Sequence, residues 1–209
     1  MPDTLHRMRL ARAAARLNAQ SGHTELPPLI FLTDDVRTPD PLPAIRALPR
    51  GSLVIVRSKN PQRRRELAHA AARIAQRQGL LLSIAGDTAL AAETAADGLH
   101  LSEAEIEKAG RYRANNKSWL ITAAAHSAHA ALQAYLSGAH AVLLSPIFAT
   151  QSHTDRAPLG LARLRTIART SPIPIYALGG IDAENMERLK NIPLAGIAAI
   201  GALLLKPSP

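Results

Sequence analysis

Eight short apolar runs alternate with polar turns and helical stretches along almost the whole chain. The runs span residues 28–33, 52–57, 80–84, 98–101, 119–123, 141–145, 173–177 and 196–200. Their near-continuous apolar character is typical of parallel strands that are covered on both faces. The stretches between them include helical patterns over residues 63–78, 88–95, 127–136, 162–169 and 183–189. This order predicts eight βα units.

Eight βα units that close on themselves form a (β/α)8 TIM barrel, an α/β fold. An open, doubly wound sheet is the alternative, because the same alternation builds both folds. After the eighth run only residues 202–209 remain, too few for a full closing helix. We therefore predict a single barrel domain over residues 26–209 with a truncated last helix.

A basic helix is predicted ahead of the barrel, within an N-terminal helical extension of residues 1–25. Residues 3–20 are rich in Ala, Leu and Arg, which favour helices. We expect the side with Leu5, Met8 and Ala15 to pack on the body, covering the surface that the missing last helix would have covered. A helix lying on a membrane surface is the less favoured alternative, because alanine is a weak membrane anchor.

The charge balance restricts the partners. The chain has 25 Lys+Arg against 16 Asp+Glu, a formal net charge of +9, which favours anionic partners. Aromatic residues make up only 3%, too few for a platform that stacks single-stranded nucleic acid. No apolar run approaches the roughly 20 residues of a membrane span. We expect phosphorylated small molecules as partners, with no nucleic acid and no membrane, and a homo-oligomer is left open.

The chain contains no cysteine. This excludes disulfides, thiolate zinc sites and thiol nucleophiles, and it is compatible with a reducing compartment. The basic N-terminus has no continuous apolar core of the kind that a signal peptide needs. A cytoplasmic location is therefore expected.

Glycines follow the last two predicted strands, at the end of the barrel where active sites lie. Gly179 and Gly180 follow the seventh strand, and Gly201 follows the eighth. Glycines let a phosphate approach backbone N–H groups, and barrels often bind phosphate between these two strands. A tight loop would explain Gly179 and Gly180 alone, but their register with Gly201 favours a phosphate site.

Two cations follow the second predicted strand. Arg57 and Lys59 alternate with Ser58, so we expect both to point to the same side, where they would suit a diphosphate. A solvated strand end is the alternative. The sequence thus predicts two separated anion sites that face each other across one end of the barrel.

His126 is the histidine best placed for proton transfer. It follows the fifth strand, where an imidazole could act as general acid or base, although a capping or loop role suits the position equally. His100 falls within the fourth strand and is expected to be packed. The eight histidines show no compact metal-ligand spacing, so a zinc site is not predicted.

Four motifs resemble the thiamine phosphate synthase/TenI family, in order, from about Leu29 to Leu203. They are Ala96–Leu101, Gly138–Val142, Ser145–Thr150, and Ala177–Ile181 with Asn185. The resemblance implies a (β/α)8 barrel. Synthase members join hydroxymethylpyrimidine diphosphate to thiazole phosphate and release diphosphate with the help of Mg²⁺. TenI-like members instead isomerise a thiazole phosphate carboxylate and do not use the diphosphate.

The resemblance also implies roles for individual residues. It assigns catalytic roles to Arg57, Lys59 and His126, and Mg²⁺ binding to Asp87 and Glu105. Arg57 and Lys59 match the diphosphate-binding Arg-x-Lys of the family, and His126 matches a histidine that TenI-like members use for proton transfer. The substrate- and phosphate-binding positions are Thr150, Ser152, His153, Gly179, Gly180, Ile200 and Gly201.

The chain departs from the family in the pyrimidine-diphosphate half of the site. The departures are Ile55 for Gln, Ala85–Gly86 for Asn-Asp, Ala124 for Ser and His153 for Lys. Asp87 lies next to the missing acidic position and could replace it if the loop shifts. A synthase is favoured because Arg57 and Lys59 are kept. A TenI-like thiazole tautomerase is the second interpretation, and a non-catalytic barrel that binds phosphorylated ligands is the third.

Overall fold

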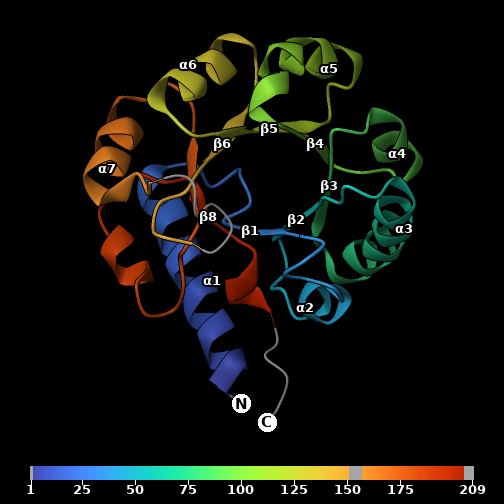
Figure 1. The fold of residues 1–209 in the computed structure, drawn as a ribbon, viewed down its shortest axis with the longest axis horizontal. Helices are drawn as coiled ribbons and strands as arrows, with labels where there is room; N and C mark the ends of the chain where they lie inside the picture. The colour runs from blue at the N-terminus through green and yellow to red at the C-terminus, as the bar shows by residue number, and fades with distance from the viewer. Residues whose placement is uncertain (1, 151–156, 205–209) are drawn as a thin grey trace.

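The eight strands form a closed barrel (Figure 1), in a computed structural model that describes residues 2–150 and 157–204. The strands are β1 Leu29–Leu32, β2 Leu53–Val56, β3 Leu81–Ala85, β4 Gly98–Leu101, β5 Leu120–Ala125, β6 Ala141–Leu144, β7 Ile175–Leu178 and β8 Gly196–Ala199. Each pairs in parallel with the next, and β8 closes onto β1 with Leu29 opposite Ile197. The predicted barrel is confirmed, and the open sheet is excluded.

Helices surround the barrel. They are α1 Pro2–Ser21, α2 Leu42–Arg46, α3 Pro61–Gln78, α4 Thr88–Glu93, α5 Ala109–Asn115, α6 Ala128–Leu136 and α7 Gly160–Thr170, with 3-10 helices η1 Glu103–Lys108, η2 Met186–Leu189 and η3 Gly201–Leu203. The short α2, η1 and α5 were not predicted. In the described part of the chain, no helix combines the length and the apolar character that a membrane crossing needs.

The helix predicted over residues 183–189 is wrong: the structure has only the 3-10 turn η2 there. The Asp182 carboxylate accepts the backbone N–H groups of Glu184 and Asn185, and the Asn185 side chain accepts the N–H of Asp182. These local bonds offer the backbone an alternative to the helical ladder. The segment after β7 therefore stays compact and turn-like.

The strands separate two apolar layers. Along β1, Leu29 and Phe31 face the outer helices, whereas Ile30 and Leu32 face the barrel interior. The interior is filled by such alternating residues, including Ile55 of β2 and the fully buried Tyr176 of β7, whose hydroxyl donates to the Pro27 carbonyl at 2.7 Å. A packed interior leaves space for ligands only at the ends of the strands.

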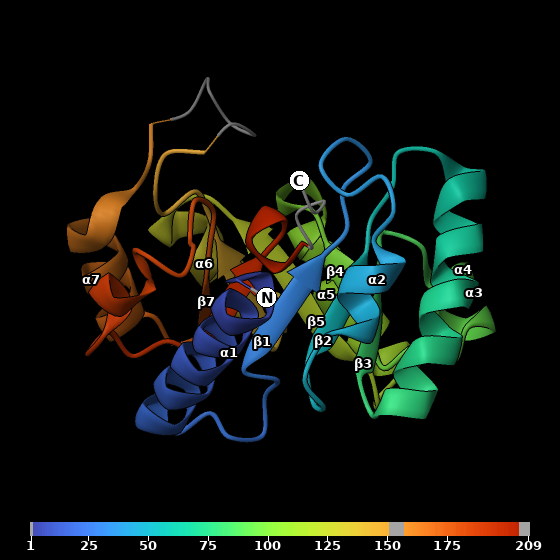
Figure 2. The same cartoon turned by 90° about the horizontal axis from the view of Figure 1, so that it is seen from below.

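Helix α1 lies along the outside of the barrel beside β1 (Figure 2), and it also packs against β8. It therefore covers the surface next to the last strand, as predicted, where η3 is the only helical element after β8 among the described residues. Its buried face differs from the predicted one. The buried apolar side chains are Leu10, Ala13, Ala14 and Leu17, at helical spacing, whereas Leu5 and Met8 are 59% and 48% exposed and Ala15 is also exposed. At 3.6 residues per turn the two sets lie on opposite sides of the helix.

A buried asparagine fixes the end of α1 to the barrel. The Asn18 side-chain amide donates to the carbonyls of His23 at 2.7 Å and Ala195 at 2.8 Å, and to that of Leu26 at 3.2 Å. Ala195 immediately precedes β8, so these bonds join the extension to the strand that closes the barrel. Buried polar groups need such partners, and Asn18 has three of them.

Candidate active site

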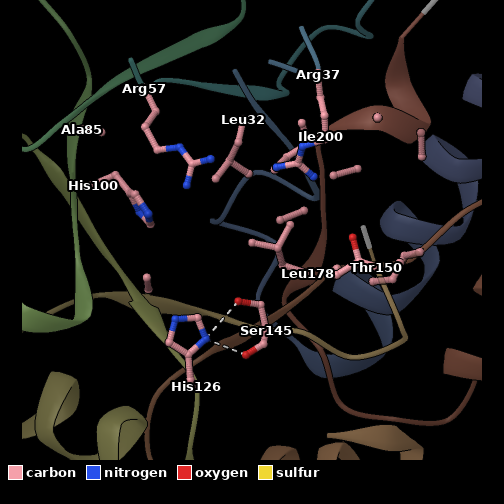
Figure 3. Close-up of a pocket in the computed structure, with 18 of the residues that line it drawn as sticks. Leu32, Arg37, Arg57, Ala85, His100, His126, Ser145, Thr150, Leu178 and Ile200 are labelled. Atoms are coloured by element: carbon pink, nitrogen blue, oxygen red, sulfur yellow. Dashed lines mark hydrogen bonds between the residues drawn. The ribbon is translucent and has the colours of Figure 1, made fainter. Parts of the chain in front are cut away.

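A cavity of about 670 Å³ opens at the carboxyl ends of the strands (Figure 3). Residues from all eight strands or the loops that follow them line it. Leu32, Ala85, Ala124, Leu178 and Ala198 contribute apolar walls, and Arg37, Arg57, His100, Glu105 and His126 contribute charged or polar groups. This is the end of a barrel where catalytic groups converge.

The predicted glycines lie on one side of this cavity, with Ile200 and Ile181 beside them. Gly179 and Gly180 both have positive φ values, 98° and 66°. A Cβ atom on Gly180 would lie 2.6 Å from the Ala149 carbonyl oxygen, and one on Gly179 would lie 3.0 Å from Pro146. Packing against the loop after β6 thus requires these two glycines, whether or not a phosphate binds.

Gly201 has no such packing reason. A Cβ atom there would meet nothing within 4 Å, and its φ is not positive. It lines the cavity together with Gly180 at the start of η3. The backbone at Gly201 is therefore accessible from the cavity, as the predicted phosphate site requires.

Arg57 lines the cavity from the end of β2. The buried Thr33 hydroxyl fixes its backbone, because it accepts the Arg57 N–H and donates to the Arg57 carbonyl, both at 2.9 Å. The guanidinium Nη2 donates to Asp34 Oδ2 at 2.7 Å. The predicted Arg57 and the predicted glycines thus line the same cavity.

Lys59 does not accompany Arg57. It is exposed and is not among the described residues that line the cavity. Strand β2 ends at Val56, and the chain then turns, with the Lys59 N–H donating to Asp35 Oδ2 at 2.8 Å. The alternation of a strand therefore does not extend to Lys59, against the expectation that both cations converge.

Arg37, in the loop between β1 and α2, is a cavity residue that the sequence pattern did not indicate. Its Nη2 donates to Asp34 Oδ2 at 3.0 Å. Burial opposes ionisation of Asp34, but the hydrogen bonds and charge of Arg37, together with the charge of Arg57, hold the pKa of this carboxyl well below its usual range. Asp34 thus stays ionised between two guanidinium groups.

His126 and Ser145 lie together on another wall (Figure 3). His126 Nδ1 is 2.7 Å from the Ser145 carbonyl oxygen and 3.3 Å from its hydroxyl, and the His126 N–H donates to Glu103 Oε2 at 2.7 Å. A carbonyl only accepts, so Nδ1 carries the proton and Nε2 is the basic nitrogen of the neutral ring. This tautomer suits a general base.

His100 is packed, as predicted, and it also lines the cavity. It is only 6% exposed, and its Nδ1 lies 2.9 Å from the Thr122 hydroxyl. Burial, reinforced by the charge of Arg57 and opposed by Glu105, lowers the pKa of His100 to about 4. The ring is therefore neutral at physiological pH.

This burial predicts a loss of stability in acid. Between the unperturbed imidazole pKa of 6.5 and the folded value of about 4, the unfolded chain binds a proton that the folded chain does not. The contribution that neutral His100 makes to stability is fully present above pH 6.5. The free energy of unfolding should fall as the pH drops towards 4. Burial also lowers the pKa of His140, with help from Arg113, so His140 acts in the same direction.

Denaturant unfolding at several pH values, with the His100→Gln variant as comparison, measures how much of the stability loss in acid comes from His100. The variant should show a shallower fall between pH 6.5 and pH 4, because glutamine does not titrate. An identical slope in both proteins would contradict the prediction.

The two predicted metal ligands, Asp87 and Glu105, have different partners. Asp87 caps α4 through the Leu90 N–H, pairs with Arg64 at 3.1 Å and is not among the described residues that line the cavity. Glu105 does line it, and the Ser102 hydroxyl and Lys108 lower its pKa despite burial. The described residues contain no cluster of three or more His or acidic side chains that could hold a metal ion. Of the two predicted ligands, Glu105 therefore faces the cavity, whereas Asp87 is engaged by Arg64 and by the first turn of α4.

The remaining predicted site residues belong to the loop after β6. Thr150 lines the cavity (Figure 3), whereas Ser152 and His153 lie outside the described residues. Of the departures from the family, Ala85, Gly86 and Ala124 also line the cavity, and Ile55 is buried in the barrel interior. At these four positions the chain thus presents apolar or small residues.

Comparison with known proteins identifies the family of this chain. The model of a family described as thiamine monophosphate synthase matches residues 30–203. The chain is 38% identical over 119 residues to a thiamine-phosphate synthase of Methanoculleus marisnigri, covering 56% of each protein. It is 29% identical over 154 residues to that of Lactococcus lactis, covering 72% of this chain and 70% of the relative. The chain spans just over half the length of the first of these relatives.

A solved structure supports the fold. A thiamine phosphate pyrophosphorylase from Pyrococcus furiosus superposes with a TM-score of 0.69, at 24% sequence identity, over 83% of this chain and 85% of the other. At this identity the likeness concerns the arrangement of strands and helices. It agrees with the closed barrel seen here.

Proposed function

The chain belongs to the thiamine monophosphate synthase family, and on that premise we propose that it is a thiamine phosphate synthase. It would be a transferase that joins hydroxymethylpyrimidine diphosphate to thiazole phosphate in thiamine biosynthesis. The observation that carries the proposal is one cavity lined by Arg57 on one wall and by Gly180 and Gly201 on another. The reaction has two substrates, each with an anionic group, and each of these groups needs its own anion-binding site.

The chemistry is a substitution at the pyrimidine methylene carbon. The bond from that carbon to the diphosphate oxygen breaks, and its electron pair leaves with the diphosphate. The thiazole nitrogen then supplies the pair for the new C–N bond. Arg57 would stabilise the charge that develops on the leaving group, which is the effect that usually contributes most. The glycine side would hold the thiazole phosphate close, so that the two reactants meet in the right orientation.

The direct test is to incubate the purified protein with both phosphorylated precursors and Mg²⁺ and to measure thiamine phosphate. Mg²⁺ is included because the family resemblance implies that it assists the release of diphosphate. We expect thiamine phosphate and diphosphate in equal amounts. Binding of both precursors without product would leave the third interpretation, a phosphate-ligand-binding barrel.

Gly201 allows the thiazole-phosphate site to be tested without disturbing the fold. In Gly201→Asp the carboxylate should repel the phosphate and raise the KM for thiazole phosphate about tenfold or more. Gly201→Asn is the matched control, because it has nearly the same shape without the charge. Both variants should melt like the wild type, since a side chain there meets open space. Equal KM values for the two variants would place the phosphate elsewhere.

A thiazole tautomerase is the second candidate, favoured by the geometry of His126. Its Nδ1 faces the Ser145 carbonyl and the ring lines the cavity, where it would move a proton on the ring of a thiazole phosphate carboxylate. This activity needs neither Arg57 nor a metal. Aromatised thiazole from the tautomer, with no thiamine phosphate from the two precursors, would select it.

The expected setting follows from the same proposal. The partners would be phosphorylated small molecules and, in the family's biosynthetic role, the protein would work in the cytoplasm. A measurement of the protein's mass in solution would show whether it assembles into a homo-oligomer.

A further inference from the structure

The loop after β1 brings a second arginine to the cavity. Asp34 begins a tight turn in which its Oδ1 accepts the N–H groups of Val36 at 3.2 Å and Arg37 at 3.0 Å. The Thr38 hydroxyl closes the same turn with a 2.6 Å bond to the Asp34 carbonyl. This turn directs the Arg37 side chain back over the carboxyl end of β1, where it lines the cavity.

Arg37 and Arg57 share one carboxylate oxygen. Their Nη2 atoms lie 3.0 Å and 2.7 Å from Asp34 Oδ2. The side chains are partly exposed, 29% for Arg37 and 46% for Arg57, whereas that of Asp34 is only 17% exposed. The two cations are thus held next to each other, with solvent-facing surface left on each guanidinium.

The local charges do not balance within this group. Asp34 carries one negative charge against two positive ones, and the neighbouring Asp35 is engaged by Arg63 at 3.3 Å and by the Lys59 N–H. An excess positive charge at a cavity wall favours an anion with several oxygens. Guanidinium groups bind such anions through paired N–H donors, and two of them suit a diphosphate.

Two of the other expected diphosphate and metal ligands do not line this cavity. Lys59 and Asp87 are not among the described cavity residues, and Asp87 is paired with Arg64. We propose that Arg37 is a substrate-binding residue that takes the place of Lys59, so that Arg37 and Arg57 together clamp the diphosphate group. This inference rests on the proposed function and names the residue that completes its leaving-group site.

Binding of inorganic diphosphate, measured by calorimetry without turnover, tests the clamp. Arg37→Gln should weaken binding about tenfold or more, the loss expected for a charged hydrogen bond. Arg73→Gln, which removes the same charge from the exposed face of α3, should bind like the wild type. Lys59→Gln should lose less affinity than Arg37→Gln.

Kinetics separates a binding role from a structural one. Arg37→Gln should raise the KM for the pyrimidine diphosphate and leave the KM for thiazole phosphate unchanged. If the glutamine variant does not fold, Arg37→Lys keeps the charge and should still weaken diphosphate binding several-fold, because an ammonium lacks the fork of donors. Wild-type affinity in the Arg37 variants, or an equal loss in Arg73→Gln, would overturn the clamp.

The clamp and the proposed function fail in different ways. If the wild-type protein makes no thiamine phosphate but binds diphosphate through Arg37, the clamp holds and the synthase proposal fails. If the wild-type protein makes thiamine phosphate and the Arg37→Gln variant binds diphosphate with wild-type affinity, the synthase proposal holds and the clamp proposal fails.

Discussion

A protein that lacks residues 1–22 should fail to fold stably. The truncation removes Leu10 and Leu17, each about 1% exposed, together with the buried Ala13 and Ala14. Burial of one leucine side chain contributes about 1.5–3 kcal/mol, and the faces of β1 and β8 under α1 would also be exposed to water. The total loss is comparable with the roughly 5–15 kcal/mol that stabilises a typical domain.

Thermal unfolding followed by circular dichroism measures this effect. Because the truncated protein should be largely unfolded, point variants give the graded test. Leu17→Ala should cost about 2–5 kcal/mol, as other buried leucine truncations do. Leu5→Ala is the matched control on the same helix, and it should change stability by less than about 0.5 kcal/mol because Leu5 is 59% exposed. A truncated protein with an unchanged melting temperature would refute the covering role of α1.

Replacing Arg57 should have the largest effect on activity. In Arg57→Ala the leaving diphosphate loses a guanidinium that the Thr33 hydroxyl and the Asp34 carboxylate hold at the cavity. Loss of one such preorganised donor typically costs 10²–10³ in kcat, and we expect a decrease of about 100-fold or more in thiamine phosphate formation. Steady-state kinetics with both precursors measures it.

Two comparisons make the Arg57 result specific. Arg57→Lys keeps the charge without the fork of donors and should recover only part of the activity. Thiazole tautomerisation through His126 does not use a diphosphate, so Arg57→Ala should leave that reaction intact if the chain performs it. Equal loss of both reactions would point to a damaged barrel instead of a lost contact.

The sequence by itself determined the barrel and part of its site. Eight apolar runs with helical patterns between them are local signals, because a strand buried on both faces needs apolar residues at almost every position. The rule that barrel chemistry lies at the carboxyl strand ends then located Arg57, Gly180 and Gly201, all of which line the cavity. The composition of residues 3–20 also predicted the basic first helix.

Tertiary structure decided where side chains point and which charges meet. Leu10 and Leu17 face the barrel although Leu5 and Met8 have equal apolar character, because only one side of α1 meets β1 and β8. Lys59 leaves the cavity because β2 ends at Val56, and Asp87 pairs with Arg64.

Arg37 enters the cavity because Asp34 holds it beside Arg57, across 20 residues of sequence. Local periodicity specifies elements since each residue is tied to its near neighbours along the chain. Which charged side chains pair depends on which loops the closed barrel brings together. The distance between two such loops is set only when the chain has folded.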